Sequence, residues 1–184
     1  MTRKYTELTF TDSVKEAQEQ FGSRATAAKV AGWEIDDEHI SPNEAGFIAE
    51  RDSFYMATVN EDGWPYVQFR GGPKAFLKVL DAKTLGYADY RGNRQYISTG
   101  NLKQNDRVAL FFMDYPNRRR LKLMARTEVF DASDRPDLLE RLEAPSYAAR
   151  IERVVLFHVV AFDWNCPQHI TPRFTEEELR SAMS

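Results

Sequence analysis

Between residues 54 and 130 the sequence consists mainly of short strand-like segments separated by tight turns, and this pattern most constrains the fold. Several of these segments alternate apolar and polar residues, which is typical of strands with one buried face. The predicted strands are 54–59, 64–70, 75–80, 84–89, 107–115, 120–130 and, further along, 151–164. Such short connections argue against a doubly wound parallel sheet. We therefore expect a mainly β fold, with six to seven antiparallel strands in a Greek-key barrel and peripheral helices.

Three of these strands allow predictions about which side chains are buried. In the segment 64–70, Gln68 and Arg70 fall on one face and Val67 and Phe69 on the other. The segment 107–115 is almost continuously apolar, which predicts burial on both faces. The segment 120–130 alternates again, so one face is predicted to point into the core.

Helical patterns flank the strand region. Residues 11–30 predict one amphipathic helix, with Ser13 and Glu16 as a capping box and Gly22 as a weak point. Residues 41–44 (Ser-Pro-Asn-Glu) predict a second helix start, and that helix should end near residue 51. Further helices are expected at 93–103, at 135–142 and, opened by Thr175 and Glu178, at the end of the chain. The organisation we predict is a single domain, 1–184, with a helical N-terminal extension over 1–46 and a C-terminal tail over 165–184.

Composition excludes several protein classes. The chain has 184 residues, is 42% apolar and 29% charged, and contains one cysteine, Cys166, so an internal disulfide framework is excluded. No window is apolar enough to span a bilayer, and residues 1–5 lack the apolar core of a signal peptide. We therefore expect a cytoplasmic protein without a membrane segment.

The charge is distributed unevenly along the chain. The net charge is −3, but residues 70–126 contain thirteen Lys and Arg against four acids, a net of +9, so the remainder carries −12. The alternative to a functional role is lysine and arginine collected at turns for solubility. A positive pocket for an anionic ligand explains the asymmetry better. Nucleic acid is disfavoured as a partner because the basic residues are dispersed and accompany no nucleic-acid motif.

The stretch 90–98 (Tyr-Arg-Gly-Asn-Arg-Gln-Tyr-Ile-Ser) is the strongest candidate for a phosphate site. It joins a predicted strand to a predicted helix, where backbone N–H groups and arginine can hold an anion. Lys78 and Asp89 lie on neighbouring predicted strands and are expected to converge on it. The candidate residues of this group are Lys78, Asp89, Asn93, Arg94, Gln95 and Ser98. The chain has no G-x-G-x-x-G and no P-loop motif.

Three other groups of residues are candidates for ligand contact. Gln68, Arg70 and the Gly71–Gly72 pair end a strand, where glycine lets a backbone approach a flat ligand, although a bulge would explain the pair equally well. Arg120 and Lys122 share a strand face and could reach one ligand. The segment 164–169 combines Trp164, Cys166 and His169 but lacks metal-ligand spacing and an evident activating base, so we interpret it as a loop over a pocket.

Taken together, these motifs resemble the pyridoxamine 5′-phosphate oxidase-related FMN-binding split-barrel family. The resemblance covers about residues 47–163. It is most specific in three blocks: 65–73, then 89–102 continued by 105–110, and 116–126. It implies a homodimer with FMN bound in clefts at the subunit interface.

The resemblance also assigns residues to parts of the cofactor. In order, these are Lys78, Asn93, Arg94 and Gln95 at the phosphate; Asp89 at the ribityl chain; Gln68, Arg70 and Gly71 at the isoalloxazine edge; Arg120 and Leu121 from the other subunit; and Trp164, with the loop to residue 169, over the ring. Arg70 or Lys74 is a candidate donor near N1 and O2 of the flavin. No catalytic residue and no metal site is predicted.

The implied function is an FMN-binding flavoprotein, an oxidoreductase that transfers hydride between flavin N5 and a small molecule. Pyridoxamine 5′-phosphate oxidase activity is an alternative. It is disfavoured because residues 165–173 replace the substrate-binding Arg-x-His segment of the true oxidase and a helical N-terminal extension is added. A non-catalytic flavin- or haem-binding module is a second alternative, and a deazaflavin cofactor in place of FMN is a third.

Overall fold

The computed structural model describes residues 3–164 and 167–183. Its seven strands form one sheet in the order β2-β1-β5-β6-β7-β4-β3, and every neighbouring pair is antiparallel. The strands are β1 (Ser53–Val59), β2 (Pro65–Gly71), β3 (Lys78–Asp81), β4 (Thr84–Tyr90), β5 (Arg107–Asp114), β6 (Arg119–Asp131) and β7 (Ile151–Trp164). The predicted mainly β, antiparallel fold is confirmed.

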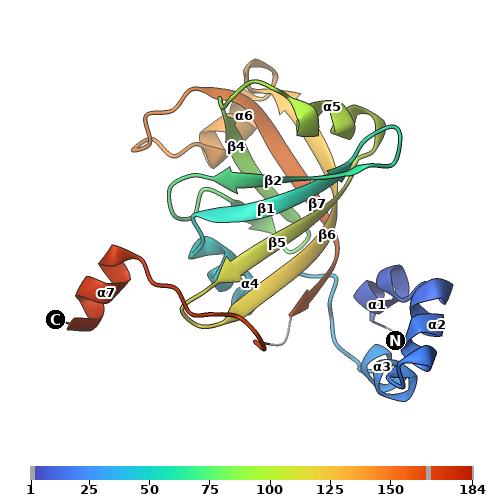
Figure 1. Cartoon of the computed structure of the whole chain (residues 1–184). Helices are drawn as coiled ribbons and strands as arrows, with labels where there is room; N and C mark the ends of the chain where they lie inside the picture. The colour runs from blue at the N-terminus through green and yellow to red at the C-terminus, as the bar shows by residue number, and fades with distance from the viewer. Residues whose placement is uncertain (1–2, 165–166, 184) are drawn as a thin grey trace.

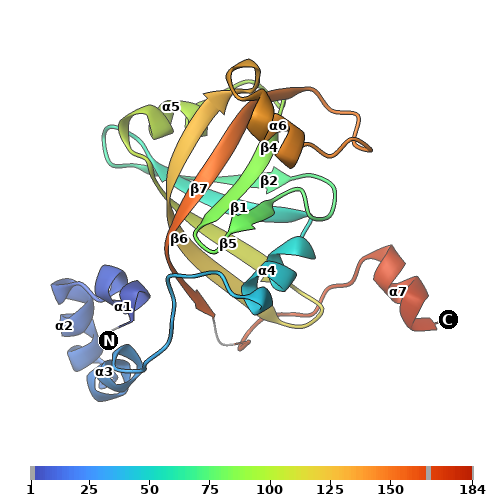
Figure 2. The same cartoon turned by 180° about the vertical axis from the view of Figure 1, so that it is seen from behind.

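The sheet curls into a barrel, as Figures 1 and 2 show, and aromatic side chains pack inside it. Phe54 on β1 packs against Phe112, Tyr87 and Phe157, with ring centroids 5.5, 5.7 and 6.1 Å away. Tyr87 and Phe157 lie on β4 and β7, which stand several strands away from β1 in the sheet order. These contacts therefore join opposite walls of a barrel. The edge strands β2 and β3 do not pair with each other, so the barrel is left open between them.

The wall formed by β1, β2, β5 and β6 has an outward apolar surface, which we call the outer face. On β5, Val108, Leu110 and Phe112 are buried, while the alternating outward residues are only half-buried. The prediction that β5 is buried on both faces is therefore wrong for the described residues, because none of their helices fully covers this side. Val67 and Phe69 on β2 are 59% and 58% exposed on the same face. The inward face predicted for β6 is confirmed.

Three short helices precede the barrel: α1 (Lys4–Thr9), α2 (Asp12–Gln20) and α3 (Arg24–Ala31). The prediction of one helix over 11–30 is wrong, because Gly22 takes a φ of +73° and divides it. The helix cap is also different: Thr11, not Ser13, accepts the hydrogen bond at the start of α2. Helix α1 is anchored by Asp37, whose carboxylate accepts from the backbone N–H groups of Lys4 and Tyr5 at 2.9 and 3.0 Å.

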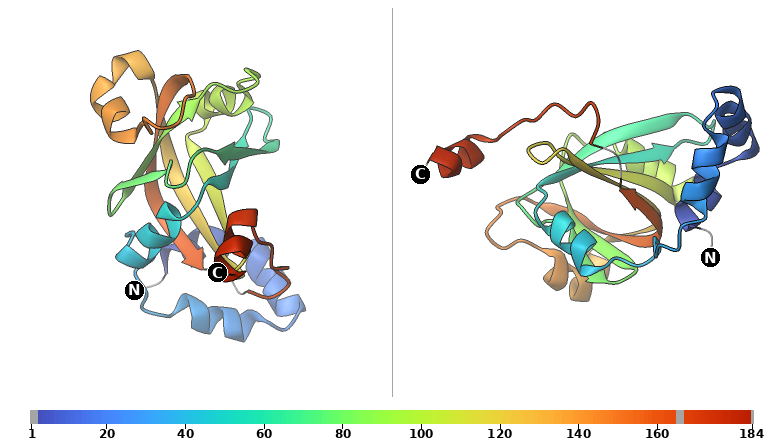
Figure 3. Two further views of the ribbon diagram at one scale, coloured as in Figure 1. Left: turned by 90° about the vertical axis from the view of Figure 1, so that its left-hand side faces the viewer. Right: turned by 90° about the horizontal axis from the view of Figure 1, so that it is seen from below.

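Three of the remaining helices lie at the ends of the barrel, and the last one stands away from it (Figure 1). They are α4 (Pro42–Ala49), α5 (Ile97–Gln104), α6 (Pro136–Leu142) and α7 (Glu176–Met183), with a short 3-10 helix at Ala132–Asp134. The capping box predicted for α4 is present, with Ser41 and Glu44 bonded reciprocally. Figure 3 shows that α1–α3 and α7 project from the barrel in different directions. No helix in the described part of the chain is both long and apolar enough to cross a bilayer.

Candidate functional site

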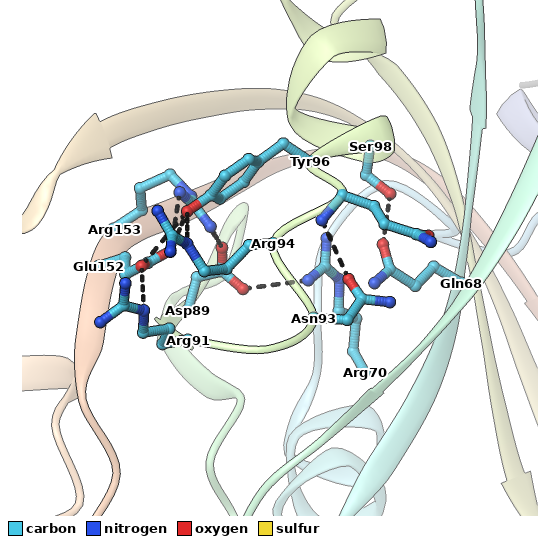
Figure 4. A network of polar contacts seen from close by, with 11 residues as sticks. Gln68, Arg70, Asp89, Arg91, Asn93, Arg94, Tyr96, Ser98, Glu152 and Arg153 are labelled. Atoms are coloured by element: carbon cyan, nitrogen blue, oxygen red, sulfur yellow. Dashed lines mark hydrogen bonds and ion pairs between the residues drawn. The ribbon is translucent and has the colours of Figure 1, made fainter.

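A small polar cavity of about 170 Å³ opens where β2, the loop after β4, α5 and β7 meet. Ten residues line it: Gln68, Arg70, Tyr90, Gly92, Asn93, Arg94, Tyr96, Ser98, Thr99 and Arg153. Five of the predicted site residues, Gln68, Arg70, Asn93, Arg94 and Ser98, are thus brought together. They come from segments up to thirty residues apart in the sequence, and Figure 4 shows how they converge.

Asp89 organises the arginines of this cavity from behind. Its side chain is almost fully buried, and Oδ1 accepts from Arg70 Nη1 at 3.1 Å. Oδ2 accepts from Arg153 Nε and Nη2 at 2.9 and 2.7 Å. Both carboxylate oxygens are therefore already occupied, so Asp89 orients two guanidinium groups. The Arg70–Asp89 pair also links β2 to β4 across the gap in the barrel, where no strand pairing exists.

Arg153 was missed by sequence reasoning. Burial alone would lower its pKa, but the hydrogen bonds and charge of Asp89 outweigh burial and raise the pKa of Arg153 above its ordinary value. Its guanidinium also lies 5.0 Å from the ring centroid of Tyr96. The signal that could have found it is register, because Arg153 on β7 pairs directly with Asp89 on β4. That pairing joins residues 64 positions apart and is invisible without the sheet order.

The loop over 91–96 departs from the predicted helix start. Helix α5 begins at Ile97, and Tyr96 before it takes a left-handed φ of 55°. Arg94 has a φ of 63°, so two non-glycine residues in this loop occupy a conformation that costs side-chain-bearing residues energy. Asn93 is not a helix cap; its Oδ1 accepts from the backbone N–H of Gln95 at 3.2 Å. The predicted helix start at residue 93 is wrong, because the left-handed backbone at residues 94 and 96 is incompatible with an α-helix before Ile97.

Two cationic groups of the cavity retain unused hydrogen-bond donors. Arg94 is exposed, and within the described part of the chain its side chain forms one hydrogen bond, from Nε to the Tyr96 hydroxyl at 3.4 Å. Arg70 Nε is buried and has no hydrogen-bond partner among the residues described. By contrast, Ser98 is satisfied, because its hydroxyl donates to Gln68 Oε1 at 2.8 Å. A buried donor without a partner is costly, so an anionic oxygen in this cavity would relieve the cost.

The acids near the cavity are already paired. Glu152 accepts from the Tyr96 hydroxyl at 3.2 Å and forms ion pairs with Arg91 and Arg153 at 3.2 and 3.3 Å. Since Asp89 is also occupied, the lining presents three arginines and no carboxylate to a ligand. Such a surface favours a compact group with several anionic oxygens.

Some predicted residues lie elsewhere. Lys78 does not line the cavity: its Nζ donates to the carbonyl oxygens of Arg141 and Glu143 at the end of α6, each at 2.9 Å. Unpaired carbonyls at a helix C-terminus attract a cation, and this contact replaces the predicted convergence with Asp89. Gln95 is exposed in the loop beside the cavity without lining it. Gly71 lies under the Phe69 ring, where an added Cβ would come within 2.7 Å of that ring.

Arg120, Leu121 and Trp164 belong to the opposite end of the barrel. The Leu121 side chain is fully buried in the core, so only its backbone is available to a ligand. Arg120 lies on the outer face, and its Nε is buried without a partner. Trp164 is eleven residues from Arg153 along β7, which amounts to about 35 Å of extended strand. These three residues could therefore meet the cavity only from another copy of the chain.

The Trp164 side chain is held by α4 within its own protomer. Its Nε1 donates to Glu44 at 2.8 Å, and its ring meets Phe47 edge-on at 4.8 Å. Cys166 lies outside the described residues, and His169 is exposed. No group of three or more His, Cys, Asp or Glu side chains within 3–164 and 167–183 is placed to hold a metal ion.

Comparison with known proteins relates this geometry to a family. A family model described as pyridoxamine 5′-phosphate oxidase matches residues 40–163. A search of curated proteins found no match. Among solved structures, a proposed pyridoxamine 5′-phosphate oxidase from Lactobacillus delbrueckii is 24% identical, with a TM-score of 0.53, over 70% of this chain and 97% of its own.

A second similar structure is HupZ from Group A Streptococcus. It is 15% identical, with a TM-score of 0.52, and the match covers 73% of this chain and 99% of that one. At these identities the two structures establish a common fold only. The family model, however, matches well over half of the residues. The chain therefore belongs to the pyridoxamine 5′-phosphate oxidase family.

Proposed function

We propose that this protein binds FMN and that the small polar cavity receives the phosphate group of the cofactor. The observation that carries the proposal is a cavity lined by three arginines and no carboxylate, in which Arg94 is exposed and Arg70 keeps an Nε without a partner among the described residues. A phosphate monoester offers several anionic oxygens to such donors. Family membership supports the same cofactor, since the match over residues 40–163 includes every residue that lines the cavity.

The residues available for each part of the cofactor follow from their positions. Arg70, Arg94 and Arg153 would hold the phosphate, with Arg153 taking the place that we predicted for Lys78. Asp89 would orient two of these arginines without contacting the ligand. Gln68, which accepts a hydrogen bond from Ser98, would present its amide to the ligand from the middle of β2. When bound, FMN would supply hydride chemistry at its ring, while the chain binds and orients it.

The size of the cavity requires a second wall for the rest of the cofactor. A volume of about 170 Å³ accommodates a phosphate group but not a three-ring flavin, so the ring would lie outside it. We propose that a second copy of the chain supplies the missing wall. The exposed Val67 and Phe69 support an interface on the outer face, and Arg120, with its unpartnered Nε, would face the cofactor from the partner.

The reaction that fits best is oxidoreduction of a small molecule in the cytoplasm. The cavity lining contains no carboxylate or histidine, which suits a site for a phosphate group. The second candidate is a flavin-binding module without catalytic activity, in which the bound flavin exchanges no hydride with a small molecule. Pyridoxamine phosphate oxidation would need a second phosphate site beside the ring.

The absorption spectrum of the purified protein is the first test. We expect flavin bands, and denaturation should release FMN rather than FAD or riboflavin. A colourless protein that does not take up added FMN would contradict the cofactor proposal. A Soret band would indicate haem in place of FMN, and deazaflavin absorption would indicate a deazaflavin.

Anaerobic reduction separates enzyme from binding module. The FMN-loaded protein is mixed with NADH, NADPH or pyridoxamine phosphate, and loss of flavin absorption is followed. Bleaching by one donor supports an oxidoreductase and names its class of reductant. Bleaching by dithionite alone supports the non-catalytic module.

A further inference from the structure

The N-terminal helices form an arm that projects from the barrel. Helix α1 packs against β7, whereas α2 and α3 pack against each other. The connector that follows, residues 32–36, leads back toward the barrel, and the arm (residues 3–36) stands clear of most of the barrel wall in Figures 1 and 3. Ion pairing fixes its base, because Arg3 contacts Asp163 at 2.6 Å.

The arm exposes large apolar side chains. Phe21 is 78% exposed and Trp33 is 53% exposed, while Ile35 and Leu8 are 48% and 45% exposed. Single exposed apolar residues are common, but several on one short arm indicate a contact surface. The exposed aromatic rings of this arm are of the residue types that dominate binding energy at interfaces.

The base of the arm adjoins the outer face. Tyr5 of α1 lines an apolar cavity of about 350 Å³ on that face, together with Tyr55, Val67, Phe111 and Met124 among others. The base of the arm therefore borders the apolar outer face at Tyr5. A second copy seated on the outer face would also meet the arm.

Charge complementarity identifies the occupant. Helix α2 of the arm carries three acids against one lysine, whereas the outer face carries Arg107, Arg120 and Lys122 on β5 and β6. On α2, Glu16 and Glu19 have no cationic partner in the described part of the chain. Lys122 lines the apolar cavity and likewise has no carboxylate partner among the residues described. The arm and the outer face thus complement each other in both polarity and charge.

We propose that the arm of each protomer clasps the outer face of a second copy, with the Phe21 and Trp33 side chains resting on the partner's apolar surface. The contact is reciprocal in a twofold dimer, so each copy gives an arm and receives one. This inference rests on the dimer of the proposed function. It adds the segment that holds the dimer together, while FMN contacts remain with the cavity and Arg120.

The test is the double variant Phe21→Ser/Trp33→Ser, compared with Gln20→Ser as a matched control. Gln20 is exposed next to Phe21 but contributes no apolar ring. Because the Phe21 and Trp33 side chains are more than half exposed in one protomer, the variants should fold, which circular dichroism verifies. Sedimentation over a concentration series should show a dimer dissociation constant at least tenfold higher for the double variant than for wild type, with the control unchanged.

The outcomes separate the arm from the cofactor. A wild-type dimer with an unaffected double variant overturns the arm inference and leaves the proposed dimer standing. A monomeric wild-type protein overturns both. In the supporting case, FMN affinity falls at low protein concentration and recovers once the concentration exceeds the new dissociation constant. An FMN defect that persists in the assembled dimer would show that the substitutions damage the cofactor site, which contradicts the inference.

Discussion

Two clusters at opposite ends of the barrel combine the same residue types, but the carboxylate of the Glu44 cluster is satisfied by its neighbours, whereas the cavity keeps arginine donors unused. At the α4 end, the Glu44 carboxylate accepts from Ser41, Asn43 and Trp164, and Arg119 stacks on the Trp164 ring at 4.6 Å. At the cavity end, the Arg94 guanidinium is exposed and Arg70 Nε is buried without a partner. The first group is complete within one protomer, and the second is incomplete without a ligand.

Backbone conformation separates the two ends as well. The start of α4 is a regular capping box, with Ser41 in an extended conformation before a proline. The start of α5 follows left-handed residues at positions 94 and 96 and has no side-chain cap. Strain that surrounding contacts must hold in place is typical of binding sites. The comparison therefore supports the proposal that the cavity receives a ligand, while the Glu44 contacts hold α4 to β7.

Replacing Asp89 by Ala should have the largest effect, because it removes the buried carboxylate that pairs with both Arg70 and Arg153 and leaves Arg153 with Glu152 alone. We expect the free energy of unfolding to fall by about 3–5 kcal/mol in urea denaturation without flavin. Asp106→Ala is the control, since its ion pair with Arg126 is exposed and should contribute less than about 1 kcal/mol. Equal stabilities of the two variants would contradict the organising role of Asp89.

Replacing Arg94 by Ala should act on ligand binding alone. Its guanidinium has little contact with the protein, so stability should not change, while FMN affinity should fall roughly ten- to a hundredfold through loss of a charge-assisted contact. Arg118→Ala is a matched control, because Arg118 is also an exposed arginine with a positive φ, of 53°. Fluorescence titration of FMN measures both. Equal FMN affinities of the Arg94→Ala and Arg118→Ala variants would mean that the phosphate does not bind at the 91–96 loop.

Replacing Glu44 by Gln should act on stability alone. The variant weakens the capping box of α4 and the contact to Trp164 Nε1, which should cost about 1–2 kcal/mol in thermal or urea unfolding. FMN affinity of the dimer should stay unchanged. Glu50→Gln, at an exposed position after the same helix, should be close to wild type. A flavin defect in Glu44→Gln would mean that the two ends are coupled.

The pH dependence of the Glu44 contribution should be the smallest effect. Burial alone would raise the pKa of Glu44, but hydrogen bonds from Ser41, Trp164 and Asn43 outweigh it and lower this pKa below the ordinary value of 4.5. A depressed carboxyl pKa stabilises the fold above the unfolded-state pKa, and this contribution is lost as the pH falls through the folded-state pKa. The melting-temperature difference between wild type and Glu44→Gln should therefore shrink from pH 6 toward pH 3. A constant difference would contradict this account.

Sequence reasoning found most of the strands because alternation and turn residues are local signals. The segment 151–164 is β7 with the predicted bounds, and the α4 start is as predicted. It failed where non-local packing decided the outcome. The outward residues Ala109, Phe111 and Met113 of β5 are apolar yet only half-buried, because none of the described helices fully covers them.

The cavity shows the same division. Gln68, Arg70, Asn93, Arg94 and Ser98 were named from motif composition, and the structure brings them together. Their cofactor contacts remain predictions, as do those of Arg120 and Trp164 from the partner copy.

The sequence by itself determined the strand and helix types, the positive charge of the 70–126 region and the loop that borders the cavity, because these depend on residues close together in the chain. Only the tertiary structure determined which charged side chains pair with each other. Strand pairing places Arg153 beside Asp89. Lys78 donates to carbonyl oxygens at the end of α6 and therefore does not line the cavity. A buried charge needs a partner within a few ångströms, and the sheet order, not distance along the chain, determines which charges meet.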